Sequence, residues 1–307
     1  MNILVTGGAG FIGSHIVDAY LEQNHQVTVL DNLSTGDKSF IHPKARFYHK
    51  DLSAPDIGEI LKKEKIEVIN HHAAQVSVPD SVADPVFDAK SNIIGTLQLL
   101  QNAVSSGVKK FIFASTGGAI YGEQAPMPTA EEYPCKPESP YGISKFGVEN
   151  YLRFYENNNG LKTVVFRYSN VFGPRQNPHG EAGVVAIFCK RLLDNRAPVI
   201  YGDGEQTRDY ILVKDVVRAN VAALEPECSG VFNIGTGKET SVNTLSEELL
   251  RLSGKSLKAE YAPARGYEQR RSCIAYRKFY DQFGWEPEVP LEEALIETFN
   301  YFKNQAP

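Results

Sequence analysis

Short apolar runs alternate with longer segments of helical spacing along the first half of the chain. β-Strands are predicted at residues 3–6, 26–30, 46–48, 68–71, 110–114 and 162–166. Apolar side chains recur at the spacing of amphipathic helices in residues 11–23, 55–63, 84–106 and 141–157. This alternation is typical of an α/β fold, a doubly wound parallel sheet with helices on both faces. Ligands of such sheets bind at the carboxyl ends of the strands.

The pattern loosens after about residue 173, where prolines and glycines separate shorter elements. A helix is predicted at residues 215–224, followed by a strand at 231–235 that returns to the main sheet. We therefore expect a main domain of residues 1–170, with 208–235 returning to it, and a smaller α/β lobe of residues 171–307.

Composition narrows the class of protein. The 307 residues are 42% hydrophobic and 22% charged, as in soluble globular proteins, and the net charge of −5 argues against a general nucleic-acid binder. The four cysteines form no C-x-x-C pair, and no apolar stretch approaches the ~20 residues that span a bilayer. No charged-then-apolar leader precedes the first strand, so we expect a cytoplasmic protein with reduced thiols and no membrane or nucleic-acid partner.

Closely spaced glycines follow the first predicted strand: Gly7, Gly8, Gly10 and Gly13. This spacing fits a dinucleotide-binding fingerprint, in which glycines permit a tight turn and let backbone N–H groups approach a pyrophosphate. The motif lies between a strand and a helix, which is the context that the interpretation requires. The helix beginning near Phe11 would present its positive end to the phosphates. A Rossmann-type dinucleotide site is therefore predicted.

Asp31 ends the second strand, roughly twenty residues after the glycines, where a carboxylate can accept hydrogen bonds from both ribose hydroxyls. A carboxylate repels a 2′-phosphate, so NAD is favoured over NADP. The alternative is that Asp31 merely begins the turn at residues 31–34. Asp51 and Leu52, after the third strand, would approach the adenine.

His71 and His72 raise the question of a metal site. Adjacent residues on a strand point to opposite faces, so the two do not readily ligate one ion. We expect packed histidines and no metal. Ala73 and Ala74, which end the fourth predicted strand, are small enough to let the cofactor pass.

Tyr141 and Lys145 are four residues apart on a predicted helix and hence share a face. An ammonium beside a phenol favours phenolate, and a cationic nicotinamide would act in the same direction. Such a tyrosine can take a proton from a sugar hydroxyl as hydride leaves the adjacent carbon. Ser115 and Thr116, at the end of the preceding strand, supply hydroxyls where the fold converges. The alternative is an amphipathic helix with an exposed lysine.

These motifs resemble those of the extended short-chain dehydrogenase/reductase superfamily, most closely the UDP-glucose (UDP-galactose) 4-epimerases. The resemblance covers essentially the whole chain and is strongest at residues 6–13, 31–34, 115–122, 141–145, 167–175 and 202–210. It implies interconversion of UDP-glucose and UDP-galactose through a transient 4-keto sugar and bound NAD. It also implies that Tyr141 is the base, that Lys145 holds the nicotinamide ribose and lowers the pKa of Tyr141, and that Thr116 binds the sugar O4.

The resemblance extends to the binding residues. The implied NAD contacts are Gly7, Gly10, Phe11, Ile12, Gly13, Asp31, Asn32, Ser34, Gly36, Asp51, Leu52, His72, Ala73, Ala74, Gln75, Asn92, Ala114, Ser115, Tyr141, Lys145 and Tyr168. The implied UDP-sugar contacts are Thr116, Tyr141, Asn170, Val184, Val185, Tyr201, Arg208, Arg265, Glu268 and Arg270. Tyr201 would stack on uracil, and the guanidinium groups suit the two phosphates. The alternative for the arginines, above all Arg270, is an ordinary surface position.

Related enzymes leave two other activities open. The superfamily's 4,6-dehydratases carry an Asp-Glu pair after the catalytic threonine, and its UDP-glucuronate decarboxylases carry a Glu. Gly117 and Gly118 stand there in this chain and cannot transfer a proton, which favours simple oxidation and return of hydride. Glu131 or Glu132 could substitute, so an NDP-glucose 4,6-dehydratase remains an alternative, as do a UDP-glucuronate 4-epimerase and a non-catalytic NAD-sensing module.

Several positions depart from the epimerase pattern. Tyr267 replaces a usual glycine and Ala275 a usual aspartate, which puts the local backbone near Glu268 in doubt. Ser272 stands where some members hold a bulky tyrosine, so the resemblance implies room for an N-acetyl group. Members of the superfamily also pair two helices per subunit into a four-helix interface. The apolar residues around the predicted helices 84–106 and 141–157 therefore suggest a homodimer, or else burial against the chain's own lobe.

Overall fold

The computed structural model describes residues 1–179, 183–264 and 269–305. The chain divides into two compact units, each built from several stretches of sequence. The first unit comprises Met1–Gly122, Pro134–Arg167 and Val217–Phe232. The second comprises Glu123–Tyr133, Tyr168–Val216 and Asn233–Pro307. Among the described residues, no helix combines the length and apolarity that crossing a bilayer requires.

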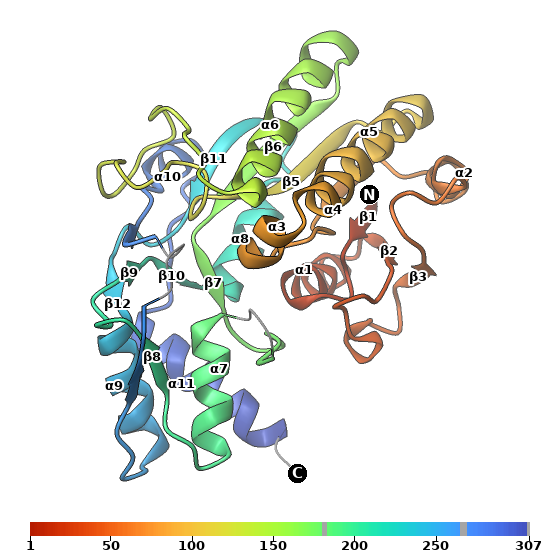
Figure 1. The fold of residues 1–307 in the computed structure, drawn as a ribbon. Helices are drawn as coiled ribbons and strands as arrows, with labels where there is room; N and C mark the ends of the chain where they lie inside the picture. The colour runs from red at the N-terminus through yellow and green to blue at the C-terminus, as the bar shows by residue number, and fades with distance from the viewer. Residues whose placement is uncertain (180–182, 265–268, 306–307) are drawn as a thin grey trace. The chain divides into compact units, whose positions relative to one another are not determined.

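A seven-stranded sheet in the order β11-β6-β5-β4-β1-β2-β3 forms the centre of the first unit (Figure 1). Its strands are β1 (Asn2–Thr6), β2 (Gln26–Asp31), β3 (Arg46–His49), β4 (Val68–His71), β5 (Lys110–Thr116), β6 (Lys162–Tyr168) and β11 (Gly230–Ile234). Pairing is parallel from β3 through β5. The predicted strand at 231–235 does return to this sheet, as β11. The strand order reverses between β1 and β4, which places the crevice of a doubly wound sheet beside Thr6 and His71.

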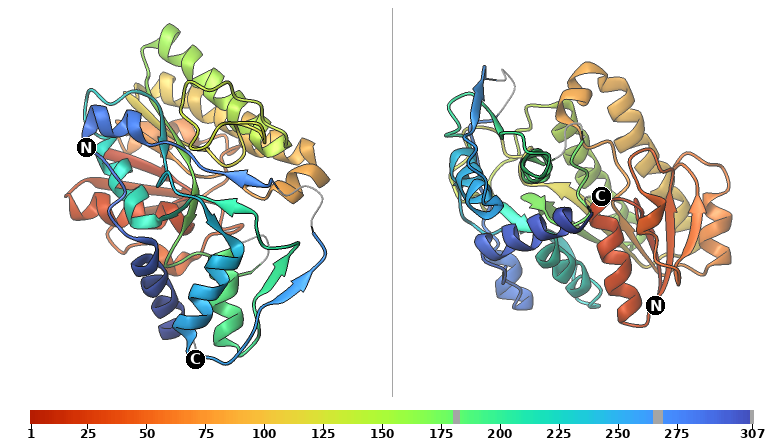
Figure 2. Two further views of the ribbon diagram at one scale, coloured as in Figure 1. Left: turned by 90° about the vertical axis from the view of Figure 1, so that its left-hand side faces the viewer. Right: turned by 90° about the horizontal axis from the view of Figure 1, so that it is seen from below.

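Helices cover both faces of this sheet (Figure 2). They are α1 (Phe11–Glu22), α2 (Ile57–Lys63), α3 (Val78–Ala83), α4 (Pro85–Ala89), α5 (Gly95–Ser106), α6 (Pro140–Asn159) and α8 (Val213–Ala222). Alternate strand residues such as Leu4 and Phe111 pack with apolar residues of α2, α5 and α6. On the α1 face, the Tyr20 hydroxyl donates to the Asn220 carbonyl and accepts from the Asn70 amide. The expected α/β class is confirmed.

One long predicted helix is not uniform. The predicted segment 84–106 consists of α4, a π-helical turn at Lys90–Ile94, and α5, with Asp84 as the N-cap of α4. A π turn inserts extra backbone that hydrophobic spacing does not reveal. The short helix α3 was not predicted because its start is set by capping, with the Ser77 hydroxyl accepting from the Asp80 amide, and not by apolar periodicity.

The second unit has its own apolar core. Its helices are α7 (Val184–Leu193), α9 (Val242–Ser253), α10 (Arg277–Phe283) and α11 (Leu291–Gln305). Its strands are β7 (Asn170–Phe172), β8 (Val199–Tyr201), β9 (Thr207–Arg208), β10 (Tyr210–Leu212), β12 (Thr240–Ser241), β13 (Glu260–Ala262) and β14 (Arg271–Ser272). Buried residues of α7, α9 and α11, among them Phe188, Leu245 and Phe299, form the core.

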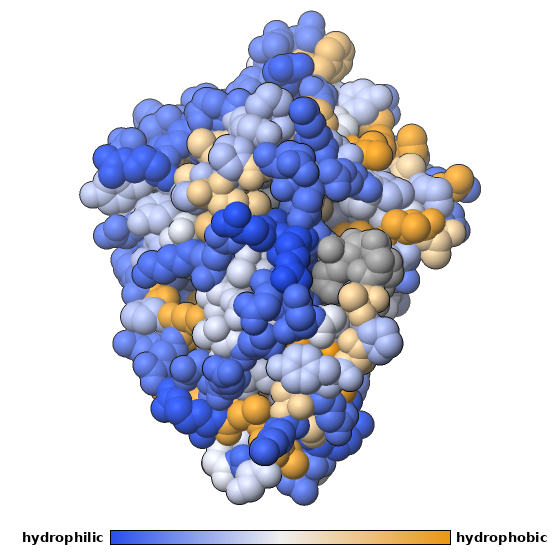
Figure 3. All heavy atoms as spheres, turned by 60° about the vertical axis from the view of Figure 1, so that its left-hand side comes forward, coloured by the Kyte–Doolittle hydropathy of each residue, from blue (hydrophilic) through white to orange (hydrophobic). Residues whose placement is uncertain are grey.

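On the face drawn in Figure 3, hydrophilic residues predominate and hydrophobic ones lie in small groups.

Candidate active site

The glycines after β1 form a tight loop against the start of α1. Gly7 has a φ of +67°, which favours glycine, and its carbonyl accepts from the Gly10 amide at 3.0 Å. A Cβ on Gly13 would lie 2.2 Å from the Gly7 oxygen, so only glycine lets α1 approach the loop this closely. Gly10 is the N-cap and has no side chain to bond the first turn of α1. This cradle fits a pyrophosphate, because backbone N–H groups and the positive helix end face it. The predicted contacts Phe11 and Ile12 are the first two residues of α1.

Asp31 lies beside this loop at the end of β2. Its Oδ1 accepts from the Leu33 amide at 2.8 Å, and its Oδ2 accepts from the Ala9 amide at 3.0 Å. A Cβ on Gly36 would lie 3.0 Å from Asp31 Oδ1, so these two predicted contacts are neighbours. The carboxylate begins the turn at residues 31–34, and it is also joined to the glycine loop, where a ribose hydroxyl would meet it.

The ends of β2 and β3 are tied together by polar contacts. Asn32 donates to Asp51 Oδ2 at 2.8 Å and accepts from the Ser34 amide at 3.0 Å. Hydrogen bonds from Ser53 hold the pKa of the Asp51 carboxyl below its usual value. Leu52 packs into the core under α2 and α5. Four further predicted cofactor residues thus lie at the carboxyl edge of the sheet.

The sequence suggested that Ala73 and Ala74 end the fourth strand. In the structure β4 ends at His71, so the two alanines lie just after the strand. His71 is buried; its Nδ1 lies 2.6 Å from Thr6 Oγ1 and its Nε2 lies 2.8 Å from Thr96 Oγ1. Both ring nitrogens of His71 are therefore hydrogen-bonded to threonine hydroxyls inside the fold.

The next predicted contacts, Gln75 and Asn92, bond each other. The Gln75 amide donates to Asn92 Oδ1, and Asn92 Nδ2 donates to the Gln75 carbonyl, both at 2.9 Å.

Burial lowers the pKa of His72 to about 3, so this histidine is neutral. In the part of the chain that the structure describes, no three His, Cys, Asp or Glu residues are placed to hold a metal ion.

Tyr141 and Lys145 lie on the first turns of α6. The Ser139 hydroxyl caps this helix by accepting from the Gly142 amide at 3.1 Å, and Pro140 is its first residue. The Thr116 hydroxyl, at the end of β5, hydrogen-bonds the Tyr141 phenol. The structure therefore brings the predicted threonine and tyrosine into direct contact.

Lys145 is buried against the end of β5. Its Nζ donates to the Ala114 carbonyl at 2.9 Å and lies 4.8 Å from the Phe113 ring centroid and 5.8 Å from that of Tyr141. Burial lowers the pKa of Lys145 to about 8, an effect that the nearby carboxylates of Asp88 and Glu149 oppose. The ammonium is thus placed between the strand and the phenol.

That Lys145 lowers the pKa of Tyr141 stays a prediction, and in the described residues other groups dominate this pKa. Enclosure of the phenol hydroxyl by protein atoms raises the pKa of Tyr141, and the carboxylate of Asp88 raises it further. The hydrogen bond with Thr116 acts in the opposite direction. The Lys145 ammonium bonds the Ala114 carbonyl and not the phenol, so desolvation prevails.

A buried ion pair supports this site, and the sequence interpretation missed it. Arg167 donates to both carboxylate oxygens of Glu149, at 3.1 Å from its Nε and 2.6 Å from its Nη2. Its Nη1 donates to the Tyr121 hydroxyl at 2.8 Å. Ser115, a predicted cofactor contact, donates its hydroxyl to Glu149 at 2.5 Å. Only the helical spacing of Lys145 and Glu149 could have hinted at this pair.

Most of the predicted UDP-sugar contacts belong to the second unit. Tyr168, a predicted cofactor contact, is buried. Asn170, a predicted UDP-sugar contact, is the first residue of β7, and its amide donates to the Asp209 carbonyl at 2.8 Å. Val184 begins α7 and is half-buried, whereas Val185 points into the core of this unit. The side chain of Val185 is therefore used for packing.

The predicted phosphate-binding arginines have different surroundings. Arg208 is half-buried in β9, and its Nη1 donates to a backbone carbonyl at 2.8 Å. Arg270 is exposed and makes a two-pronged ion pair with Asp203, at 2.8 and 2.9 Å. Arg265 and Glu268 lie outside the described residues.

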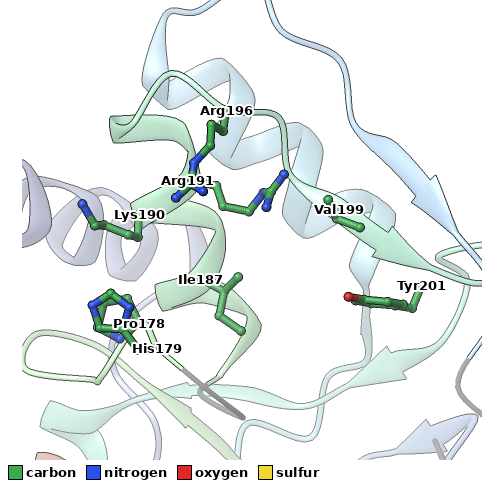
Figure 4. Close-up of a pocket in the computed structure, with 8 residues that line it drawn as sticks. All are labelled: Pro178, His179, Ile187, Lys190, Arg191, Arg196, Val199 and Tyr201. Carbon is green, nitrogen blue, oxygen red and sulfur yellow. The ribbon is translucent and has the colours of Figure 1, made fainter.

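A pocket of about 340 Å³ adjoins Tyr201, itself a predicted uracil contact (Figure 4). It is lined by Pro178, His179, Ile187, Lys190, Arg191, Arg196, Val199 and Tyr201. Lys190 and Arg196 both pair with Asp194, while Arg191 lies 4.0 Å from Glu260. The second unit thus offers an aromatic ring next to basic side chains.

Comparison with known proteins matches residues 3–235 to the NAD dependent epimerase/dehydratase family. UDP-glucose 4-epimerase of Mycolicibacterium smegmatis is 43% identical over 100% of both chains. The crystal structure of UDP-glucose 4-epimerase with UDP-glucose from Thermotoga maritima is 50% identical, covers 99% of both chains and has a TM-score of 0.97. UDP-N-acetylglucosamine 4-epimerase of Methanobrevibacter ruminantium, in complex with UDP-N-acetylmuramic acid, is 37% identical over 99% of both chains, with a TM-score of 0.94.

Proposed function

Because this chain belongs to the NAD dependent epimerase/dehydratase family, we propose that it is a UDP-hexose 4-epimerase that interconverts UDP-glucose and UDP-galactose. The observation that carries this proposal is the contact of Tyr141 with Thr116 and its proximity to Lys145, at the same sheet edge as the glycine cradle. Relatives of this activity align with the whole chain.

The chain's own residues account for the proton transfers. Tyr141 takes the proton of the sugar 4-hydroxyl, Thr116 holds that oxygen, and Lys145 supplies positive charge beside the phenol. NAD⁺, held by the loop of Gly7, Gly10 and Gly13 and by Asp31, would supply reversible hydride acceptance and a positive ring that favours phenolate. Tyr141 would return its proton to the sugar O4 as C4 is reduced on its other face, which would invert C4 and leave no net oxidation.

The residues beside Thr116 favour epimerisation over dehydration. Gly117 and Gly118 have no side chain that could carry a proton. Glu131, the possible substitute, already accepts at its Oε1 from the Asn233 amide at 2.7 Å. Incubation with UDP-glucose in D₂O, followed by NMR, tests this choice. C4 inversion without solvent exchange supports the epimerase, and deuterium at C5 or C6 contradicts it.

The nucleotide would bind to the second unit through Asn170, Tyr201 and Arg208, together with Arg265 and Glu268. An acidic protein needs local cations for a diphosphate, and Arg208 is a half-buried cation of this kind. Arg270 contributes less, because Asp203 already neutralises it.

Ser272 is expected to admit UDP-N-acetylhexosamines. It is a small buried residue of β14, opposite Arg208 in the β9 pairing, and a relative of this chain is a UDP-N-acetylglucosamine 4-epimerase. Ser272→Tyr should lower kcat/KM for UDP-N-acetylglucosamine by at least about tenfold while changing that for UDP-galactose far less, because added bulk rejects the larger sugar. Ser272→Ala is the matched control and should retain both substrates. Wild-type turnover restricted to UDP-glucose and UDP-galactose would contradict this expectation.

A homodimer is proposed from exposed apolar side chains on α4, the π turn and α6. Phe87, Ile94, Ile143 and Phe154 are 54%, 48%, 54% and 54% exposed, and the last two share a face of α6. Burying such a face against a second copy removes this apolar surface from water.

Phe154→Glu should therefore weaken dimerisation by at least about tenfold, which sedimentation equilibrium can measure. Tyr261→Glu, at an exposed apolar position of the second unit, is the control and should leave the association unchanged. A wild-type chain that sediments as a monomer at all concentrations would exclude the dimer.

A further inference from the structure

A fully buried carboxylate, Asp88, lies on α4 two residues before the π-helical turn begins. Its Oδ2 accepts from the Ser144 hydroxyl at 2.5 Å. Its Oδ1 accepts from Asn92 Nδ2 at 3.0 Å and from Gln75 Nε2 at 3.4 Å. All three partners can act as donors, so the site matches an acceptor-only carboxylate.

Asp88 connects two parts of the candidate active site. Ser144 directly precedes Lys145 on α6, so the bond from Asp88 reaches the helix that carries the base. Asn92 connects Asp88 to the sheet edge, because its carbonyl accepts from Thr96 Oγ1 at 2.7 Å. Thr96 Oγ1 also contacts His71, and His71 in turn contacts Thr6 at the start of the glycine loop. A continuous line of buried hydrogen bonds therefore joins α6 to the end of β1.

The side chains that donate to Asp88 in the described part of the chain are all neutral, yet burying a carboxylate without an opposite charge is costly. Lys145, which directly follows the Asp88 partner Ser144 on α6, is a cation whose pKa the Asp88 carboxylate raises. The titratable groups around Lys145 come from α4, α6 and the end of β4: Asp88, Tyr141, Glu149, His71 and His72. Burial lowers the pKa of both histidines, so the groups that raise the pKa of Lys145 are the carboxylates of Asp88 and of Glu149, the latter paired with Arg167.

We propose that Asp88 is a positioning residue of the epimerase reaction, which holds α6 through Ser144 and serves as the counter-charge of Lys145. The inference rests on the proposed function. Asp88 does not touch the reacting atoms; it acts through the helix and through the charge that Tyr141 and Lys145 experience.

The charge has a measurable consequence. Asp88 raises the pKa of both Tyr141 and Lys145, so its neutralisation lowers both. The kcat profile depends on the ionisation of both groups, because Tyr141 acts as the base and Lys145 as the neighbouring cation. Asp88→Asn should therefore move both limbs of the kcat profile for UDP-galactose to lower pH, by about 1 unit. A purely structural role would lower kcat at every pH and leave the limbs in place.

Two matched variants separate charge from position. Ser144→Ala keeps the carboxylate and removes its bond to α6, so kcat should fall about tenfold with KM and both limbs unchanged. Asp80 is an exposed carboxylate on α3, so Asp80→Asn should change neither kcat nor the position of the two limbs. Unmoved limbs in a folded Asp88→Asn protein overturn the proposal. If Asp88→Asn does not fold, Ser144→Ala decides: wild-type kcat overturns the proposal, and the tenfold loss supports it.

A titration distinguishes this failure from failure of the proposed function. The phenolate absorbance of Tyr141, taken as the difference between each protein and its Tyr141→Phe counterpart, needs no substrate. Asp88→Asn should lower this titration midpoint even if the wild-type chain proves unable to epimerise UDP-galactose. An unchanged midpoint overturns the role of Asp88, whereas an inactive wild type overturns only the activity.

Discussion

Replacing Tyr141 with phenylalanine is expected to reduce the kcat for UDP-galactose by about 10³-fold or more. Phenylalanine keeps the ring on α6 but has no hydroxyl to exchange a proton with the sugar, and a positioned acid–base group contributes about 10²–10⁴-fold. A 10³-fold loss corresponds to about 4 kcal/mol of transition-state stabilisation. The conversion of UDP-galactose into UDP-glucose, followed by NMR or a coupled assay, measures the effect.

The phenol makes one hydrogen bond with Thr116, so the variant should fold and retain NAD. Tyr155→Phe is the matched control, because Tyr155 lies on the same helix and packs against the core of the first unit. It should keep wild-type turnover. A Tyr141→Phe protein with undiminished turnover would exclude Tyr141 as the base. A non-catalytic NAD sensor would show no turnover even as wild type, and the variant would leave its ligand binding intact.

Replacing Gly13 with alanine is expected to remove the dinucleotide. The new methyl group would lie 2.2 Å from the Gly7 carbonyl oxygen and 3.0 Å from the Gly8 Cα, and neither is a side chain that can rotate away. The loop must therefore separate from α1, at a cost that overpacking generally sets at about 1–3 kcal/mol. Separation also moves the backbone N–H groups off the pyrophosphate. We expect NAD affinity at least about tenfold lower, with turnover reduced in proportion.

The nucleotide content of the purified protein and its thermal unfolding measure both effects. Gly107→Ala is the control: Gly107 has a φ of +79° at the end of α5, but nothing lies within 4 Å of its added Cβ. It should lose about 1–2 kcal/mol through backbone strain and keep its NAD. A Gly13→Ala protein with full NAD content would show that the cradle does not hold the cofactor.

The sequence predicted those features that local rules control. Alternation of apolar runs gave the strands of the main sheet, and the glycine spacing between a strand and a helix gave the loop after β1. The four-residue spacing of Tyr141 and Lys145 placed both on one face of α6. Each of these depends on residues within one or two turns of each other, and helical or strand geometry then fixes their relative positions.

Other features arise from residues far apart in the sequence. The bond from Ser144 to Asp88 spans 56 positions, and the bond from Arg167 to Glu149 joins a strand to a helix. No periodicity of apolar residues marks either contact. The raised pKa of Tyr141 has the same origin: spacing shows which charge is near, but not that the phenol is enclosed or that Asp88 faces it.

The sequence by itself therefore determined the doubly wound sheet, the cofactor class and the placement of Tyr141 and Lys145 on one helix. Tertiary structure alone decided the electrostatic balance at Tyr141, the use of Ser115 as a donor to Glu149, and the burial of Val185 in a core. Element type follows from short-range patterns of side chains. Desolvation and charge depend on every group that packing brings within a few ångströms, and that set is defined only once the chain has folded.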